Sequence, residues 1–464
     1  MSDAVIGLEI HVQLDTRTKM FCADRNEFGG EPNTRVCPVC LGLPGALPVT
    51  NERAVALGVR TALGLSCTVH PVSVFARKNY FYPDLPKGYQ ITQYDRPLAT
   101  DGWLDVNGER VRIRRVHLEE DAGKSLHDRV PDLTAVDLNR AGVPLVEIVT
   151  EPDLTSPGQT REFLKHLKQL LEYLGVSDCD MEKGSLRVDA NVSLAGEASS
   201  TRSELKNMNS FANVERALLF EIGRRSQIQA VGGRLSAATL LWDADRGEAR
   251  PIRAKEESDD YRYFPEPDLP PLVLEQAAID EARSRLPELP AARRARFRDT
   301  YGLPEYDADV LTSTRDVADY FEAVAGAAGD AKAASNWVMT EVLAWLNRSR
   351  TPLSDLPVPA ERLAELIRLV GRGTVSNTAA RQVFEQMLST GRSAADIVEA
   401  EGLAQVRDAQ RLEDWAEAVL AAHPDVAERY RQGEDKLLGF LMGQLMRMSD
   451  GRADPARASR ILRE

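Results

Sequence analysis

The sequence predicts an α+β fold: an N-terminal domain built on an antiparallel sheet with flanking helices, followed by helices alone. Residues 5–14 and 185–194 alternate apolar and polar side chains with period two, which is typical of strands with one buried and one open face. After residue 290, apolar residues recur at helical spacing and alanine becomes frequent. The two prolines of Leu286–Pro290 disfavour regular structure, so we expect the boundary there.

The elements of the N-terminal part follow one another in a simple order. The strand over 5–14 is followed by one over 109–115, where arginines alternate with β-branched residues. A helix is expected over 159–174, because apolar residues recur there at helical spacing and Gly175 ends the pattern. The strand over 185–194 follows. The shared alternation predicts one sheet with a polar face that stays open.

The C-terminal part predicts a series of helices. They are expected near 315–325, 336–347, 360–370, 377–388, 411–421 and 434–448. Glycines at 371, 373 and 391 separate several of them. We therefore expect three domains: a sheet domain over 1–292, a helical domain over 293–404 and a small all-α tail domain over 405–464.

Composition narrows the class of protein. The chain has 464 residues, of which 43% are hydrophobic and 28% charged, as in folded globular proteins. No apolar run approaches the roughly 18–20 residues of a membrane span, and no secretory signal is evident, so no membrane association is expected. Five cysteines form no disulfide framework, which favours a cytoplasmic location. A net charge of -13 argues against a globally basic nucleic-acid binder but permits a local basic patch.

Acidic residues and histidines gather on the open faces of the expected strands. Glu9 and His11 are two residues apart and therefore share one face. Other residues with the same spacing or the same face are His117, Glu119, Asp121, Glu147, Glu151 and Asp189. Together they predict a site for a hard cation such as Mg²⁺, if the strands are neighbours in one sheet. The alternative is an ordinary solvated strand face.

Cysteines form a second candidate metal site. Cys37 and Cys40 have the C-x-x-C spacing with which thiolates share a tetrahedral Zn²⁺ ion. Cys22 is a third candidate ligand and Asp24 a fourth. The alternative is a set of ordinary thiols in a loop. Cys67 and Cys179 are isolated and are expected to be packing residues.

Several basic residues are candidate phosphate contacts. Gly123–Ser125 resembles the end of a P-loop, but Leu118 stands where the first glycine is required, so a P-loop is rejected. Lys78, Lys124, Arg187 and Lys206 remain candidates for binding ATP, with an ordinary surface role as the alternative for each. Basic and aromatic residues also mix at 77–84, as in a nucleotide or RNA-end site.

The C-terminal end is locally basic. Residues 436–463 contain six basic residues against Asp450 and Asp454, a balance of 6 − 2 = +4 in an acidic protein. Docking of a phosphate backbone requires such an asymmetry, and a solvated helix end is the alternative. The chain has no G-x-S-x-G or H-E-x-x-H motif to indicate a hydrolase.

Long blocks of the sequence resemble the B subunits of the bacterial-type glutamyl/aspartyl-tRNA amidotransferases. The blocks are VIGLEIHVQL (5–14), CPVCLGLPGALPVTN (37–51), RKNYFYPDLPKGYQITQYD (77–95), HLEEDAGKS (117–125), VDLNRAGVPLVEIVTEPD (136–153), GSLRVDANVS (184–193), ELKNMNSF (204–211) and DDYRYFPEPDLPPL (259–272). The resemblance covers essentially the whole chain and weakens after residue 290. It implies a cradle domain, a helical domain and a tail domain that binds tRNA.

The resemblance implies a tRNA-dependent ligase that uses ATP and Mg²⁺. In this family, the side-chain carboxylate of Glu-tRNA(Gln) or Asp-tRNA(Asn) is phosphorylated, and ammonia then displaces the phosphate. An amidase, the A subunit, supplies the ammonia from glutamine through a channel, and a small C subunit completes a heterotrimer. By match to the family's motifs, the Mg²⁺ ligands are Glu9, His11, Glu119, Glu147 and Asp189. Glu119 and Glu147 are also expected to be catalytic, Glu119 as a gate for ammonia, and Lys78 as a phosphate or channel contact.

One departure and two alternatives accompany the resemblance. Metal-binding relatives carry C-x-C where this chain has Cys22-Ala23-Asp24, which implies a structural zinc site with one thiolate replaced by a carboxylate. The archaeal-type relative, the E subunit, would need an inserted domain, for which 464 residues leave no room. A non-catalytic tRNA-binding scaffold would not need the acidic set. The sequence leaves open which of the two misacylated tRNAs is the substrate.

Overall fold

The computed structural model describes residues 4–130, 132–198, 201–253, 261–406, 408–449 and 451–463. The chain divides into two compact units, Met1–Leu289 and Pro290–Glu464. The division falls inside the Leu286–Pro290 segment. The first unit combines a large sheet with helices and the second is helical, which confirms the predicted α+β class.

A nine-stranded sheet is the frame of the first unit. Its strands lie in the order β14-β13-β12-β11-β1-β10-β7-β6-β2. Their bounds are β1 Ala4–Gln13, β2 Thr68–Val69, β6 Ala99–Val106, β7 Glu109–Glu120, β10 Pro144–Thr150, β11 Leu186–Leu194, β12 Ser203–Lys206, β13 Ala238–Asp243 and β14 Glu248–Arg253. The sheet is antiparallel, as predicted, except at one pair: β12 and β13 run parallel. Parallel strands need a crossover connection, which the long helix between them supplies.

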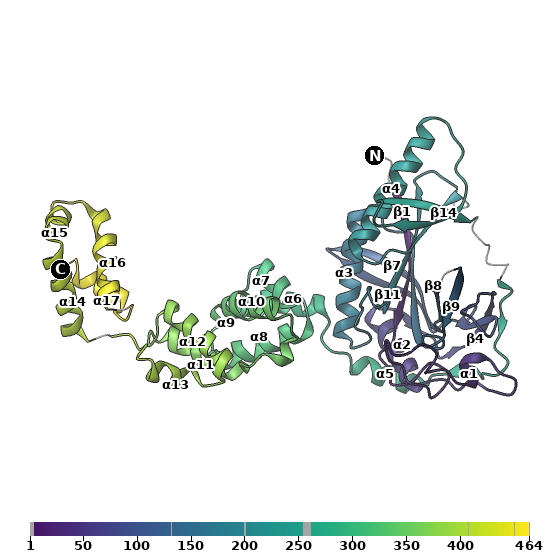
Figure 1. The fold of residues 1–464 in the computed structure, drawn as a ribbon, viewed down its shortest axis with the longest axis horizontal. Helices are drawn as coiled ribbons and strands as arrows, with labels where there is room; N and C mark the ends of the chain where they lie inside the picture. The colour runs from purple at the N-terminus through teal and green to yellow at the C-terminus, as the bar shows by residue number, and fades with distance from the viewer. Residues whose placement is uncertain are drawn as a thin grey trace. The chain divides into compact units, whose positions relative to one another are not determined.

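The predicted alternation of buried and open side chains is confirmed in two central strands of the sheet. Along β1 and β11, buried apolar residues alternate with partly exposed polar residues. Three helices pack on the apolar side: α2 (Glu52–Gly64) against β7, α3 (Pro157–Tyr173) against β6 and α4 (Phe211–Ala230) against β11 (Figure 1). The predicted helix over 159–174 corresponds to α3, whose first turn is capped by the Ser156 side chain. One face of the sheet is thus buried under helices, and the other remains available to solvent and ligands.

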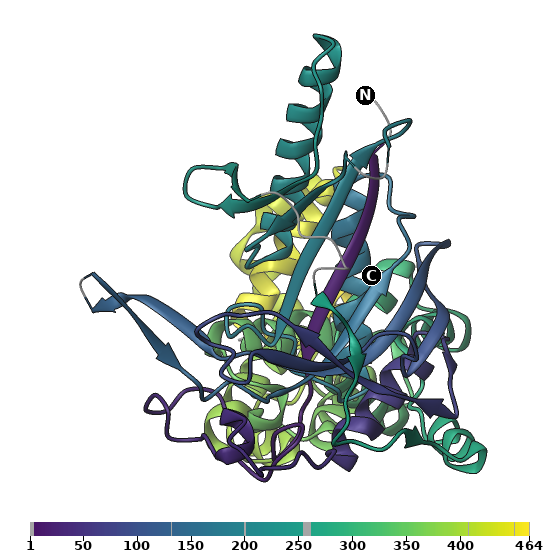
Figure 2. The same cartoon turned by 90° about the vertical axis from the view of Figure 1, so that its right-hand side faces the viewer.

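Smaller elements border the open face. A three-stranded sheet consists of β15 (Phe264–Pro265), β4 (Phe75–Asn79) and β5 (Tyr89–Gln93), and β5 packs against β7. A hairpin formed by β8 (Lys124–Val130) and β9 (Leu133–Asp137) projects away from the main sheet (Figure 2). The other elements are β3 (Val72–Ser73), β16 (Leu272–Val273), α1 (Pro38–Leu41) and α5 (Gln276–Ser284).

The second unit is built from helices. They are α6 Pro290–Tyr301, α7 Glu305–Leu311, α8 Arg315–Ala328, α9 Ala331–Trp337, η3 Val338–Val342, α10 Leu343–Ser349, η4 Leu353–Asp355, α11 Ala360–Gly371, α12 Asn377–Thr390, α13 Ala394–Ala400, α14 Ala409–Ala422, α15 Pro424–Arg431, η5 Asp435–Leu437, α16 Leu438–Met448 and α17 Pro455–Ile461. The six predicted helical segments are all present. Short helices such as α7 and α13 are not predicted, because their periodic pattern is too brief.

Two hydrophobic clusters fill the second unit. One joins buried residues from Phe297 to Val398, and the other joins buried residues from Leu412 to Leu462. The division into three domains at 292 and 404 stays a prediction. In the described part of the chain, no helix has the length and apolar character needed to cross a bilayer. The cytoplasmic location stays a prediction as well.

Candidate active site

A row of charged side chains crosses three central strands on the open face. The strand register places His11 of β1 opposite Glu147 of β10, and Glu147 opposite His117 of β7. The carboxylate of Glu147 therefore lies between two imidazoles, with its Oε2 atom 3.5 Å from Nε2 of His11 and 3.1 Å from Nε2 of His117. Glu119, two residues further along β7, faces the same way.

Three members of this row converge closely enough to share a cation. Nε2 of His11 is 3.5 Å from Oε1 of Glu119, and ligand atoms of His11, Glu119 and Glu147 all lie within 4.8 Å of one another. Glu119 and Glu147 are buried, with 2% and 6% of their surface exposed. Two carboxylates suit Mg²⁺, which takes one or two protein carboxylates and completes its shell with water and phosphate oxygens. The donor set therefore fits a divalent cation.

The carboxylates attract positive charge to this point. Burial lowers the pKa of His11, but Glu147 and Glu119 outweigh this effect and raise it to about 9. Burial likewise opposes ionisation of Glu147, and His117 and His11 together hold the pKa of Glu147 well below its usual value. Glu147 is therefore an anion at neutral pH, ready to bind a proton-bearing imidazole or a metal ion.

The neighbouring half of the row is arranged differently. The ammonium of Lys206 forms ion pairs with Asp189 and, at 3.1 Å, with Glu204. Glu9 accepts a hydrogen bond of 3.1 Å from the Asn191 amide, and burial followed by repulsion from Glu147 raises the pKa of Glu9. The structure therefore brings His11, Glu119 and Glu147 together and leaves Glu9 and Asp189, two further predicted Mg²⁺ ligands, outside that group.

Lys78 reaches the row from the small sheet. Its ammonium lies 4.8 Å from the ring centre of Tyr261 and 5.9 Å from that of Tyr80. Burial lowers the pKa of Lys78, but Tyr263, Glu119 and Glu147 together raise it above the usual value. Lys78 is thus a cation whose charge interacts with the carboxylates. On the adjacent strand, Thr92 donates a hydrogen bond of 3.1 Å to Glu119 and so helps to fix its carboxylate.

The other candidate phosphate contacts have separate surroundings. Arg187 forms an ion pair of 2.9 Å with the buried Asp121, which also lies 3.6 Å from Arg140. Lys206 is engaged by Asp189 and Glu204, as above. Lys124 is exposed at the start of β8. Arg187 and Lys206 therefore line the open face in ion pairs, whereas Lys124 belongs to the projecting hairpin.

Sequence reasoning does not assign some of the residues that shape this site. It places His117 on the right strand face but not beside Glu147, because register between strands is invisible in a single sequence. Tyr261 and Tyr263 come from a distant segment, and Tyr263 stacks on Tyr94 with ring centres 4.0 Å apart. The spacing of the two tyrosines, two residues apart beside a strand-like segment, is the available signal.

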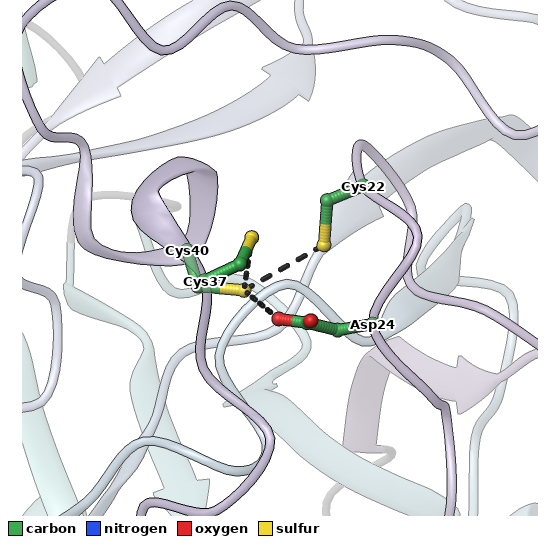
Figure 3. A group of neighbouring side chains, drawn as sticks. All are labelled: Cys22, Asp24, Cys37 and Cys40. Carbon is green, nitrogen blue, oxygen red and sulfur yellow. Dashed lines mark hydrogen bonds between the residues drawn. The ribbon is translucent and has the colours of Figure 1, made fainter.

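The predicted cysteine site is assembled by one loop and the short helix α1 (Figure 3). Cys22 and Asp24 lie on one loop, and Cys37 and Cys40 lie at the start of α1. The Sγ atoms of Cys22 and Cys40 are 3.7 Å apart, those of Cys37 and Cys40 are 3.8 Å apart, and Asp24 Oδ2 is 3.2 Å from Cys40 Sγ. Zinc–sulfur bonds of about 2.3 Å give a tetrahedral edge of about 3.8 Å. The four side chains therefore fit one Zn²⁺ ion.

The surroundings of Cys40 also favour its thiolate form. Hydrogen bonding with Cys22 lowers the pKa of Cys40 to about 6, against the effect of burial, and it raises the pKa of Cys22. The fully buried Lys19 donates to the carbonyl of Arg35 at 2.6 Å and to Cys40 Sγ at 3.4 Å. Cys40 is thus held as a thiolate, the form that binds zinc.

Two family models match most of the chain. Residues 4–280 match the GatB/GatE catalytic domain, and residues 319–464 match the GatB domain. Relatives with full-length similarity include the aspartyl/glutamyl-tRNA(Asn/Gln) amidotransferase B subunit of Moorella thermoacetica, 52% identical over 100% of this chain and 99% of the relative. The corresponding B subunits of Chlorobium phaeobacteroides and Carboxydothermus hydrogenoformans are 50% and 48% identical, each over 100% of this chain and 98% of the relative.

Proposed function

The chain belongs to the family of aspartyl/glutamyl-tRNA amidotransferase B subunits, and we propose that its open sheet face activates the side-chain carboxylate of a misacylated tRNA for amidation. Family membership makes the chain part of a tRNA-dependent ligase that has several subunits. The observation that carries the proposal is the group formed by His11, Glu119 and Glu147. A non-catalytic scaffold would not need two buried carboxylates within reach of one cation, because buried charge is costly even where it is partly paired.

The proposed reaction has two steps. An oxygen of the tRNA-bound side-chain carboxylate attacks the γ-phosphorus of ATP, ADP leaves, and an acyl phosphate forms. Ammonia then attacks the carbonyl carbon, inorganic phosphate leaves, and the attacking nitrogen loses a proton to give the amide. Phosphorylation is needed because a carboxylate is a poor electrophile and its oxygen a poor leaving group. Phosphoryl transfer depends mainly on positioning and charge neutralisation.

Each residue of the open face has a role suited to these steps. His11, Glu119 and Glu147 would hold Mg²⁺, which neutralises phosphate charge when it is bound. Lys78 provides a positive charge beside the carboxylates for a phosphate or for the developing anion. Glu119, hydrogen-bonded to Thr92, would take the proton that the attacking nitrogen loses. Glu9 and Asp189 flank the group and remain candidates for water-mediated contact with the cation. Lys124, Arg187 and Lys206 are candidate contacts for ATP.

The nitrogen is proposed to come from a second protein. Because the chain has no hydrolase motif, an amidase A subunit would release ammonia from glutamine, and a small C subunit would complete a heterotrimer. The tRNA substrates are tRNA(Gln), tRNA(Asn) or both. The basic stretch 436–463 supports a role in tRNA binding, because Lys436, Arg447 and Arg460 are exposed there.

A structural zinc ion is proposed at the cysteine site. The sulfur–sulfur distances and the thiolate character of Cys40 support it. The ion would fasten the loop that carries Cys22 to helix α1. No catalytic role is assigned to it, because all four donors belong to the protein and leave no open position for a substrate.

Co-expression with the amidase A subunit and the small C subunit tests the proposed function. The purified complex should convert Glu-tRNA(Gln), Asp-tRNA(Asn) or both to the amide when it is given ATP, Mg²⁺ and glutamine. With ammonium chloride in place of glutamine, amide formation should persist, because the sheet face needs only the nitrogen nucleophile. A complex that forms and hydrolyses glutamine but amidates neither tRNA would contradict the proposal.

A further inference from the structure

A cavity of about 740 Å³ lies among the helices of the second unit. Its lining residues come from four segments: the end of α8, the run from α9 into η3, the end of α11 and the start of α12. Ile367 and Val370 give it an apolar floor, and the half-buried Trp337 forms part of its wall. The volume lies within the range typical of small-molecule sites, roughly 300–1,000 Å³.

The wall of this cavity contains an unusual backbone feature. Helix α9 continues into α10 through the π-helical turn η3, Val338–Val342, which begins directly after Trp337. Thr340 and Glu341, both in the π turn, line the cavity. A π turn inserts one residue into the helical repeat and is frequent at functional sites, because it changes the direction of neighbouring side chains. This turn determines which side chains α9 and η3 present to the cavity.

Positive charge dominates the rim. Arg368 of α11, Arg372 directly after α11 and Arg381 of α12 line the cavity together with two carboxylates. Both carboxylates are engaged: Asp330 caps α9 by accepting from the Ala333 amide at 2.9 Å, and Glu341 pairs with Arg381 at 3.1 Å.

The remaining guanidinium groups are less constrained. Arg368 donates to the carbonyl oxygen of Ala327. In the part of the chain that the structure describes, the exposed side chain of Arg372 has no hydrogen-bond or ion-pair partner. An arginine held at the rim of a formed cavity without a carboxylate partner is available to an anionic ligand.

We propose that this cavity binds a nucleotide, with its planar base against Trp337 and its phosphate at Arg372 and Arg368. Aromatic rings stack on bases of any sequence, and guanidinium groups are good phosphate partners. Asn336 and Asn377, which also line the cavity, offer amide donors and acceptors to the edge of a base. The bound nucleotide would be either an unstacked nucleotide in the body of a tRNA or a free mononucleotide. The first case rests on the proposed function.

Binding of tRNA to the assembled heterotrimer distinguishes these cases. Arg372→Glu should weaken tRNA binding about five- to tenfold and make the plot of log K against log[salt] less steep by about one. Trp337→Phe, which keeps an aromatic ring in the wall, should weaken binding less. The control is Arg348→Glu, an identical charge change on α10 outside the cavity, where Arg348 pairs with Glu385. Ultraviolet crosslinking of bound tRNA should label peptides that contain Trp337.

A second arm uses AMP, GMP, CMP and UMP without tRNA. Equilibrium dialysis measures their binding to the heterotrimer. If Arg372→Glu loses mononucleotide binding but keeps its tRNA affinity, the cavity is a site for free nucleotides. Equal behaviour of Arg372→Glu and Arg348→Glu in both arms would overturn the proposal. The kcat of amidation at saturating tRNA should be unchanged in the control Arg348→Glu. Failure of the wild-type complex to amidate would count against the proposed function alone.

Discussion

The two units use paired carboxylates in different ways. In the helical unit, Glu322 accepts hydrogen bonds from Arg293, from Arg296 at 2.6 Å and from Tyr301 at 3.0 Å. In the sheet unit, Glu119 and Glu147 approach one another around His11, with imidazoles, Lys78 and Arg187 nearby as cations. A carboxylate with two guanidinium partners is neutralised by its own fold, whereas adjoining carboxylates attract further positive charge.

This difference separates structural charge from functional charge. A complete ion-pair network shifts a pKa as strongly as an active site does, so the shift alone does not identify a site. The distinguishing feature is the arrangement of the ligand atoms. Glu322 is bound by two guanidinium groups, whereas ligand atoms of His11, Glu119 and Glu147 lie within 4.8 Å of one another, as a shared divalent cation requires.

The largest expected effect comes from the sheet unit. Glu147→Gln keeps the side-chain volume but removes the charge that attracts the cation, so transfer of the γ-phosphate of ATP to misacylated tRNA should fall at least about a hundredfold. Glutamine hydrolysis by the assembled complex should persist. Radiolabelled ATP measures the transfer. Glu248→Gln, on the exposed strand β14 of the same sheet, is the matched control and should transfer phosphate normally; normal transfer in Glu147→Gln would refute the role given to this carboxylate.

The cysteine site provides a second test of donor chemistry. The purified chain should contain about one zinc ion, and Cys37→Ser should lose it, while Cys67→Ala, which alters a buried cysteine in the main core, should retain it. Asp24→Cys should bind zinc about tenfold or more tightly, because a fourth thiolate replaces a harder ligand. Competition with a chromogenic chelator measures both. Equal zinc content in the wild type and Cys37→Ser would rule out this site.

The sequence predicts the frame of the sheet unit better than its site. Strict alternation locates β1 and β11 and assigns Glu9 and His11 to the open face, since period two determines which face a side chain occupies. It does not reveal that Glu147 lies opposite His11 or that Lys206 pairs with Asp189, because these contacts depend on the order and register of strands. The cysteine site is easier to predict, since the C-x-x-C spacing is local.

The long helix α4 is an element of the frame that the sequence does not predict. Its 20 residues are not predicted, because its apolar stripe is interrupted by arginines and glutamates. Arg225 is fully buried within it and bonds to Ser203 at 2.7 Å and to Glu197, so tertiary pairing supports a helix whose periodicity alone is weak. The crossover that this helix provides explains the parallel pair β12–β13.

A third expected effect concerns tRNA affinity in the helical unit. Truncation after residue 404 removes the separate cluster from Leu412 to Leu462 and leaves the cluster from Phe297 to Val398 intact. Binding of tRNA to the complex should weaken about tenfold, and its dependence on salt should become shallower, because phosphate contacts are lost. Glutamine hydrolysis should be unaffected. If full-length and truncated complexes give the same affinity and the same salt slope, the tail does not contact tRNA.

The smallest effect is expected at Glu322. Burial opposes its ionisation, but Arg296 and Arg293 outweigh this effect and lower the pKa of Glu322 from its usual 4.5 to about 2. Because the folded-state pKa is the lower one, the stabilisation is complete above pH 4.5 and is lost as pH falls towards 2. Glu322→Gln should reduce the free energy of unfolding by about 1 kcal/mol at pH 7, since solvent screens the pair partly.

Denaturant unfolding of the variant and the wild type at pH 7 and pH 3 measures this contribution. The difference between them should narrow at the lower pH, and amidation should remain normal. Glu305→Gln, at an exposed ion pair with Arg298 in the same unit, is the control and should change stability little. If Glu322→Gln kept its stability but lost amidation, Glu322 would be a functional charge and the comparison between the two units would be wrong.

The most direct test of the central claim is the position of a divalent cation. Crystals of the complex soaked in Mn²⁺, which takes the same oxygen ligands as Mg²⁺, should show an anomalous peak about 2.2 Å from ligand atoms of at least two of His11, Glu119 and Glu147. In crystals of Glu147→Gln the peak should weaken or disappear. Peaks found only elsewhere, with the three side chains turned away from one another, would contradict the account.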